Sequence, residues 1–190
     1  MADTEGMSRI EPKNDAEYPW YLRLMYWHQQ RSRGQKIIPS QVWGRSPVLL
    51  RRFLRMFAAF ERKSSPLDPV LRALITVRVS QINHCAFCID FNAMRVLEQG
   101  GATEKLDGLS DVSGNANLSS AEKAGLLYAE RITRSDQEVD DLQFADLKKY
   151  YSEDEIVELT GLIAFQNMSS KFNATLDLPS QGFCEWRPEA

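Results

Sequence analysis

Four helix-start signals are distributed along the chain, and together they favour an all-α architecture. Two of them are an N-cap side chain followed by a proline at the first helical position. The other two are capping boxes, in which a serine and a glutamate three residues later satisfy backbone N–H groups at the start of a helix. In chain order the signals are Ser46-Pro47, Asp68-Pro69, Ser119 to Glu122 and Ser152 to Glu155. No stretch shows strand pairs joined by hairpin turns, so we predict a helical bundle.

Apolar residues recur at helical spacing after these starts and indicate where the helices end. The β-branched stretch 75–79 has strand propensity, but the capped start and the length of its segment favour a helix. A pair of glycines stops the helix that begins at Cys85 to Cys88, which places these cysteines at a helix N-terminus. The predicted helices cover about 47–61, about 69–81, the segment from Cys88 to Gly100-Gly101, the two segments that begin at the capping boxes of Ser119 and Ser152, and a shorter piece around 140–150 that joins these two.

The size and composition fit one globular domain. The chain has 190 residues, of which 43% are hydrophobic. We expect a flexible or partner-dependent arm at residues 1–17 and a single all-helical domain at residues 18–190. The formal net charge of -3 gives no general attraction to nucleic acid. No apolar run approaches the roughly 18 residues of a membrane span, and the polar start lacks a secretory signal. We therefore predict a cytoplasmic protein that binds neither nucleic acid nor a membrane.

One aromatic face and two charged segments suggest contacts with other molecules. Trp20, Leu24 and Trp27 lie at positions i, i+4 and i+7 of a predicted helix. We interpret this face as packing in the core or against another subunit, and the alternative is a binding patch. Residues 31–63 hold nine Lys or Arg against one acid, and residues 136–158 hold nine acids against two Lys. This segregation favours complementary contacts between subunits over a basic groove for RNA.

Cys85 and Cys88 are the main functional signal. Three cysteines, two of them three residues apart, do not fit a secreted disulfide framework. At a helix start, unpaired N–H groups and the helix dipole stabilise a thiolate, and the second sulfur can then close a disulfide that releases the product. The first alternative is zinc, which needs about four ligands, whereas only Cys184, His28 and His84 remain. The second alternative is a pair of inert buried cysteines.

The residues around this pair resemble a known family. The run Leu71–Asn92 contains Arg-Val-Ser-Gln-Ile-Asn before the cysteines and Cys-Ala-Phe-Cys-Ile-Asp across them, and it is similar to the core of the alkylhydroperoxidase D-like and carboxymuconolactone decarboxylase family. The similarity extends to residues 118–123, 155–160 and Phe172-Asn173, so that about 43–178 are covered. The resemblance implies an all-helical bundle of the alkylhydroperoxidase D-like type, homo-oligomers that are often trimers or hexamers, and thiol-dependent peroxide reduction.

Three positions depart from the family pattern. Peroxidase members have a Glu twelve residues before the first Cys and a His four residues after the second, and these positions hold Ala73 and Asn92 here. Alanine cannot titrate and an Asn amide cannot act as a base near neutral pH, so we expect slow turnover. The further His that some members carry between the cysteines is Phe87. His84, directly before Cys85, is the remaining imidazole near the pair and a candidate for proton transfer.

These observations predict a thiol–disulfide redox protein with Cys85, Cys88 and His84 as catalytic residues and with no cofactor or metal. The expected substrate is a small hydroperoxide or disulfide, and the expected electron donor is a thiol. The order in which the two cysteines react is left open. One alternative is a non-catalytic homo-oligomeric binding protein on the same fold. The last alternative is a carboxymuconolactone-type decarboxylase, for which no convincing acid–base pair remains.

Overall fold

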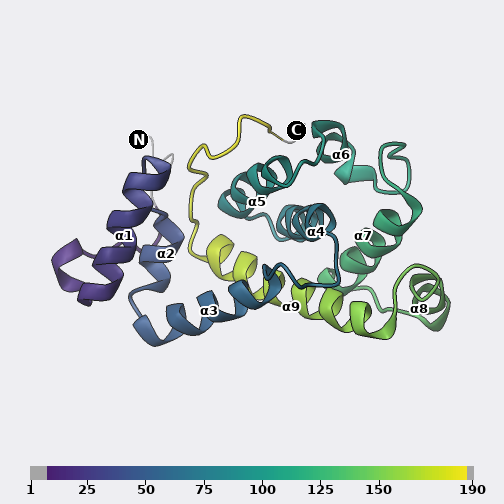
Figure 1. Cartoon of the computed structure of the whole chain (residues 1–190), viewed down its shortest axis with the longest axis horizontal. Helices are drawn as coiled ribbons and strands as arrows, with labels where there is room; N and C mark the ends of the chain where they lie inside the picture. Colours follow the sequence, from purple (N-terminus) through teal and green to yellow (C-terminus); the bar gives the residue numbers. More distant parts are fainter. Residues whose placement is uncertain (1–7, 188–190) are drawn as a thin grey trace.

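The computed structural model describes residues 8–187, and all of the regular secondary structure in this range is helical (Figure 1). This confirms the predicted all-α architecture for the described part of the chain. Over the same range, no helix has both the length and the hydrophobicity needed to cross a membrane. In chain order the elements are the short 3-10 helix η1 (Asp15–Glu17), α1 (Trp20–Arg33), α2 (Ile38–Trp43), α3 (Pro47–Phe60), α4 (Pro69–Ile82), α5 (Ala86–Glu98), α6 (Thr103–Asp107), η2 (Leu109–Asp111), α7 (Ser120–Thr133), α8 (Asp141–Leu147) and α9 (Glu153–Thr175).

Three of the four predicted helix starts are capped by the side chains expected there, whereas Ser46 holds the N-cap position of α3 but its side chain makes no capping hydrogen bond. At α7 and α9, the hydroxyls of Ser119 and Ser152 accept hydrogen bonds from the backbone N–H groups of Glu122 and Glu155. The two glutamates accept hydrogen bonds from the serine N–H groups in return, which completes both capping boxes. At α4, the Asp68 carboxylate accepts from two backbone N–H groups of the first turn. Local capping therefore fixes where the helices around the main core begin.

Helix α4 lies at the centre of the main core, between α5, α7 and α9 (Figure 1). All residues from 71 to 80 of this helix are buried. The β-branched stretch 75–79 is helical, as predicted, and Ile75, Val77 and Val79 have no exposed surface. Burying each such side chain contributes roughly 1.5–3 kcal/mol of hydrophobic free energy. Because α5 packs against this buried helix, the first turn of α5 is held in place by the main core.

Helices α1, α2 and α3 form a smaller second core beside the end of α9. The hydroxyl of Tyr18 donates a hydrogen bond to the carbonyl of Gln41 at 2.9 Å, and the hydroxyl of Tyr26 donates to the carbonyl of Ser40 at 3.1 Å. These two bonds hold α2 against α1 and the residues just before it, and thereby place the end of α2 next to α9. The buried residues of this second core are Tyr18, Leu22, Tyr26, Trp43 and Leu50.

The prediction that Trp20, Leu24 and Trp27 pack in the core is wrong for the single chain. Their exposed fractions are 74%, 57% and 54%. Helix α1 turns Leu22 and Tyr26 inward instead. The buried tyrosine is favoured because its ring packs in the core while its hydroxyl still reaches a backbone carbonyl. Packing of the tryptophan face against another subunit stays a prediction.

Both ends of the described chain are bound to the helical body. Near the start, the backbone N–H of Arg9 donates to the carbonyl of Leu176 at 2.9 Å, and its guanidinium donates to the carbonyl of Thr175 at 3.0 Å. The predicted arm is thus attached over its described part, and its first seven residues lie outside the described residues. After α9, residues 177–187 run back along α5 as an irregular segment that we call the C-terminal strap (Figure 1).

Candidate functional site

The cysteine pair lies at the start of α5, as the sequence predicted. His84 has a positive φ of 54° and lies in the turn that leads the chain from α4 into α5. Cys85 is the N-cap residue, and its sulfur accepts a hydrogen bond from the backbone N–H of Cys88 at 3.2 Å. The two sulfur atoms are joined as a disulfide, with the Cα atoms 5.2 Å apart. In the reduced state, the same N–H groups and the helix dipole stabilise a sulfur anion.

Both sulfurs are shielded from bulk solvent by aromatic rings. The exposed fraction is 1% for Cys85 and 3% for Cys88. Phe87, between the two cysteines, packs against Phe91 and Phe183, with ring centroids 5.6 and 6.0 Å apart. Phe183 belongs to the C-terminal strap, so the strap covers this side of the pair. Access to the sulfurs therefore depends on the cavities next to them.

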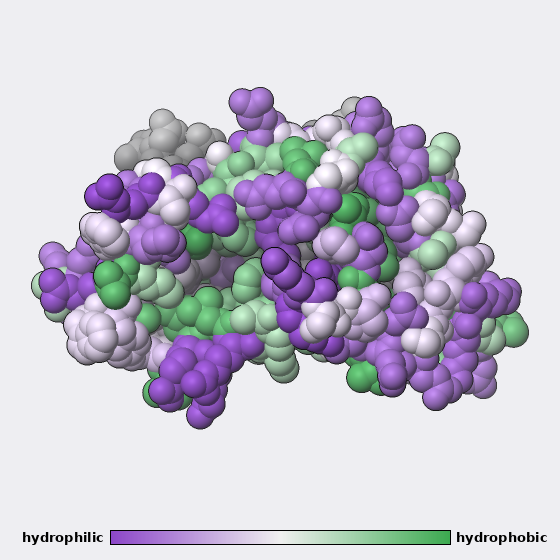
Figure 2. Space-filling model, in the orientation of Figure 1, coloured by the Kyte–Doolittle hydropathy of each residue, from purple (hydrophilic) through white to green (hydrophobic). Residues whose placement is uncertain are grey.

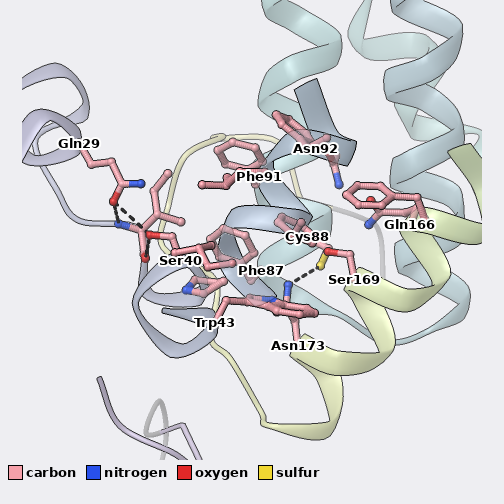
Figure 3. A pocket seen from close by; sticks show the side chains of 17 residues that line it. Gln29, Ser40, Trp43, Phe87, Cys88, Phe91, Asn92, Gln166, Ser169 and Asn173 are labelled. Atoms are coloured by element: carbon pink, nitrogen blue, oxygen red, sulfur yellow. Dashed lines mark hydrogen bonds between the residues drawn. The ribbon is translucent and has the colours of Figure 1, made fainter. Parts of the chain in front are cut away.

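A cavity of about 150 Å³ lies between the second core, formed by α1, α2 and α3, and the main core. Cys88 forms part of the wall of this cavity (Figure 3). Figure 2 shows the molecule hollowed on this side, with apolar residues at the edge of the hollow. None of the described residues that line the cavity is charged. Cys85 is not among them, so the cavity distinguishes the two cysteines. The lining residues are Gln29, Ile37, Pro39, Ser40, Trp43, Leu50, Phe53, Leu54, Phe57, Phe87, Cys88, Phe91, Asn92, Phe165, Gln166, Ser169 and Asn173.

Asn173, on α9, contacts the sulfur of Cys88 directly. Its side-chain nitrogen donates a hydrogen bond to this sulfur at 3.2 Å, and its side-chain oxygen accepts one from the indole N–H of Trp43 at 3.2 Å (Figure 3). The indole is stacked against Phe53 and Phe172, with centroids 4.9 and 3.8 Å away. The indole N–H therefore fixes the amide so that its NH₂ group faces the sulfur. The similarity at Phe172-Asn173 did not reveal this contact, because 85 residues separate Asn173 from Cys88.

The end of the cavity next to Cys88 is polar. The side chains of Asn92, Gln166 and Ser169 lie around this end in Figure 3. The side-chain oxygen of Asn92 accepts a hydrogen bond from the Arg95 guanidinium at 3.2 Å, while its side-chain nitrogen has no acceptor among the described residues. Asn92, which stands where the family pattern has a histidine, thus lines the same cavity as Cys88. It offers a hydrogen-bond donor but no base.

The other two positions that the sequence singled out lie apart from this cavity. Ala73 is fully buried in α4 and has no group that can exchange a proton. His84 is exposed and lines a different hollow, of about 360 Å³, together with Arg78 and Trp186. Among the hydrogen bonds made by the described residues, none joins its imidazole to a cysteine. The structure thus brings Cys85 and Cys88 together, whereas the catalytic role of His84 stays a prediction.

Asp90, which follows the pair on α5, holds the C-terminal strap in place. Its carboxylate accepts hydrogen bonds from the hydroxyl of Ser180 and from the backbone N–H groups of Gln181, Phe183 and Cys184, at distances between 2.8 and 3.1 Å. Burial raises the pKa of this carboxyl, but the four hydrogen bonds outweigh burial and lower the pKa below its ordinary value. Asp90 is therefore an ionised anchor for the segment that covers the cysteine pair.

Comparison with known sequences supports the resemblance stated from the motifs. A profile of the carboxymuconolactone decarboxylase family matches residues 47–131. The chain is also 36% identical over 169 residues to the uncharacterized protein YnjA of Escherichia coli (strain K12), and this match covers 89% of the chain and 93% of YnjA.

Comparison with solved structures finds the same fold. A peroxidase-related protein from Ralstonia eutropha JMP134, described as an alkylhydroperoxidase AhpD core, has a TM-score of 0.82 at 18% identity, over 95% of this chain and 96% of the other. The debrominase Bmp8 has a TM-score of 0.77 at 19% identity, over 92% of both chains. A variant of Bmp8 has also been crystallised with 2,3,4-tribromopyrrole. At below 20% identity, these similarities show that the fold is shared over nearly the whole chain.

Proposed function

Because the chain belongs to the carboxymuconolactone decarboxylase family, we propose that it is a thiol–disulfide redox protein that reduces a small hydroperoxide. In this proposal, Cys85 and Cys88 cycle between a dithiol and a disulfide. The observation that carries it is the joined pair of sulfurs at the start of α5, one of which forms the wall of a cavity. The likeness to a peroxidase-related protein supports the same class of reaction.

The geometry favours Cys88 as the sulfur that attacks. Cys88 lines the cavity and receives a hydrogen bond from Asn173, whereas Cys85 does neither. The Cys88 thiolate attacks the terminal oxygen of the hydroperoxide, the O–O bond breaks, and the alcohol leaves after taking up a proton. The resulting sulfenic acid is attacked by the thiol of Cys85, which forms the S–S bond and releases water. One hydroperoxide and two thiols thus give one alcohol, one water and one disulfide.

An external thiol returns the pair to the dithiol state. Two donor thiols are oxidised to a disulfide while the S–S bond of the protein is reduced. We propose that the donor approaches from the hollow that His84 lines, because this residue is adjacent to Cys85 and lies outside the substrate cavity. In this role the imidazole of His84 accepts the proton of the attacking donor thiol.

Slow turnover is part of this proposal. The positions at which the family pattern has a Glu and a His hold Ala73 and Asn92, so the cavity contains no base from those positions. A positioned acid or base typically contributes about a hundredfold or more to a rate. The amide of Asn173 stabilises an anion by hydrogen bonding but cannot transfer a proton near neutral pH. The same lack of a base weighs against the decarboxylase alternative.

The proposed function is tested by counting thiols. Reduced protein, freed of reductant and treated with hydrogen peroxide or cumene hydroperoxide, should lose two thiols and yield a peptide in which Cys85 is linked to Cys88. The Cys184→Ser variant should behave in the same way, and the Cys85→Ser/Cys88→Ser double variant should consume no peroxide. If the wild-type pair stays reduced with both peroxides, the redox proposal is wrong and the non-catalytic binding protein is favoured.

A second candidate function is reductive dehalogenation of a small aromatic compound, which is favoured by the uncharged cavity wall with its six aromatic side chains and by the likeness to Bmp8. In balanced form, a carbon–halogen bond is replaced by a carbon–hydrogen bond, two thiols become a disulfide, and one halide and one proton are released. Bromide release from 2,3,4-tribromopyrrole by the reduced protein tests this candidate. If the protein releases no bromide although peroxide oxidises its cysteine pair, the dehalogenation candidate is eliminated.

We also propose that the chain forms a homo-oligomer. The exposed Trp20, Leu24 and Trp27 form an apolar face on α1. Exposed arginines on α3 carry the charge opposite to that of the exposed acids in residues 136–158, so these two surfaces could pair between subunits. Sedimentation analysis of the full chain should show an assembly larger than a monomer. Replacing all three residues of the α1 face by serine should weaken that assembly.

A further inference from the structure

The C-terminal strap forms part of the cover over the cysteine pair. The ring of Phe183 packs edge-on against the rings of Phe87 and Phe91, with centroids 6.0 and 5.4 Å apart, and this aromatic group lies against the two sulfurs. Further along the strap, Trp186 forms part of the wall of the hollow that His84 lines. One segment of the chain thus covers the disulfide and also borders the hollow from which we expect the donor thiol to approach.

In this position the strap keeps the disulfide away from a thiol on its own side of the pair. A donor sulfur must contact a protein sulfur directly, because the exchange passes through a mixed disulfide. Cys85 is only 1% exposed, and it lines neither the cavity nor the hollow of His84. The cavity reaches Cys88, on the far side from this hollow. Reduction from the side of the hollow therefore requires part of the cover to move.

The strap is held by side chains and not by regular secondary structure. Among the described residues, no backbone–backbone hydrogen bond involves residues 179–187. Three backbone N–H groups of the strap and the hydroxyl of Ser180 donate instead to the carboxylate of Asp90. Four further hydrogen bonds join Gln181 to residues 35–38, where α1 leads into α2. A segment without backbone hydrogen bonds of its own opens more readily than the helices beside it, so the strap is the part of the cover best suited to move.

A glycine lies at the point where the strap can bend. Gly182 stands between Gln181 and Phe183, is exposed and has a positive φ of 71°, which a glycine adopts without strain. Apart from the two adjacent residues, no atom lies within 4 Å of the position that a Cβ would take there. The backbone at Gly182 is therefore free to rotate. Such a rotation carries the ring of Phe183 away from Phe87 while α9 stays in place.

We propose that the C-terminal strap is a gate for the thiol that reduces the disulfide, and that the gate opens when Phe183 leaves Phe87. The place of this gate in the cycle rests on the proposed function: peroxide oxidises the pair from the cavity while the strap is closed, and the donor reduces it while the strap is open. In the reduction, two donor thiols are oxidised to a disulfide while the bond between Cys85 and Cys88 becomes two thiols. The opening itself requires only the disulfide, so it can be measured without peroxide.

The gate is tested by reducing the pair with dithiothreitol after the full chain has been oxidised with diamide. Gln181→Ala removes three of the four hydrogen bonds to residues 35–38, and it should speed reduction at least about tenfold because the closed strap is less stable. Hydrogen exchange of the backbone N–H groups of Phe183 and Cys184, followed by NMR, should speed up by the same factor, since both processes pass through the open state. The matched control Gln143→Ala, which removes a glutamine hydrogen bond between α8 and α7, should leave both rates unchanged.

Asp90→Asn loosens the strap in a second way, because one amide oxygen cannot accept the four hydrogen bonds that the carboxylate accepts. Circular dichroism establishes that each variant is folded, and both rates should again rise by a common factor. If exchange becomes faster in the folded variants while reduction keeps the wild-type rate, or if neither rate changes, the strap is not a gate and the redox function is unaffected. If both rates rise together in a protein whose cysteines peroxide does not oxidise, the gate is supported and the proposed function is rejected.

Discussion

Replacing Asn173 by leucine removes the one side chain among residues 8–187 that donates a hydrogen bond to the sulfur of Cys88, while leaving the space it fills nearly unchanged. The donor nitrogen lies 3.2 Å from the sulfur, and the residue is buried. A hydrogen bond to a charged acceptor contributes about 1.5–3 kcal/mol. Since about 1.4 kcal/mol corresponds to a factor of ten, the thiolate of Cys88 should become about 10- to 100-fold less populated at neutral pH.

The assay is alkylation of Cys88 by iodoacetamide across a pH series. It is carried out in a Cys85→Ser/Cys184→Ser background, in which Cys88 is the remaining cysteine. Asn173→Leu should slow alkylation at pH 7 by the same 10- to 100-fold and move the rise in rate to higher pH. Trp43→Phe should act in the same direction but less strongly, because the amide remains and only loses the indole N–H that orients it.

The control is Asn115→Leu, which removes another buried amide that donates to the backbone carbonyl of Lys105 rather than to a sulfur. This variant should alkylate Cys88 at the parent rate. Circular dichroism and urea unfolding establish that each variant is folded. If folded Asn173→Leu alkylates as fast as its parent at every pH, the amide does not stabilise the thiolate, and the reasoning is refuted.

Three further predictions concern residues around the pair and in the core. Folding lowers the pKa of Asp90, so the ionised carboxylate stabilises the folded chain fully above about pH 4, the ordinary value, and this contribution is lost as the pH falls through the lower folded-state pKa. The free energy of unfolding in urea should therefore fall more steeply in this acidic range for the wild type than for Asp90→Asn. Parallel curves for the two proteins would contradict this. His84→Asn, which tolerates the positive φ, should slow reduction of the disulfide by dithiothreitol at least about tenfold and leave oxidation by peroxide unchanged in stopped-flow measurements. Leu159→Ala, in the main core, should lower the free energy of unfolding by about 2–5 kcal/mol in urea, and a loss below about 1 kcal/mol would show that this core tolerates a cavity.

Signals confined to a few neighbouring residues could be predicted from the sequence. The capping boxes at Ser119 and Ser152 and the cap at Asp68 require only residues two or three positions apart, and the structure forms all of them. The placement of Cys85 and Cys88 at a helix start follows from the same local pattern. Helical spacing and capping therefore sufficed for the all-α architecture and for the position of the pair.

Features that depend on contacts between distant segments could not be predicted. Asn173 lies beside Cys88 only because α9 packs across the start of α5, and nothing in the local sequence of either residue indicates this. The orientation of α1 was missed for a similar reason. Hydrophobicity favours burying Trp20 and Trp27, but backbone carbonyls on α2 are available to the hydroxyl of Tyr26, and this partner decides which face turns inward.

The most direct test of the central claim asks which sulfur takes the oxygen of the peroxide. The Cys85→Ser and Cys88→Ser variants are reduced, treated with cumene hydroperoxide in the presence of dimedone, and analysed by mass spectrometry. The cavity geometry predicts a dimedone adduct on Cys88 of the Cys85→Ser variant and an unmodified Cys85 in the Cys88→Ser variant. An adduct on Cys85 alone, or on neither cysteine, would contradict the assignment of Cys88 as the sulfur that meets the substrate.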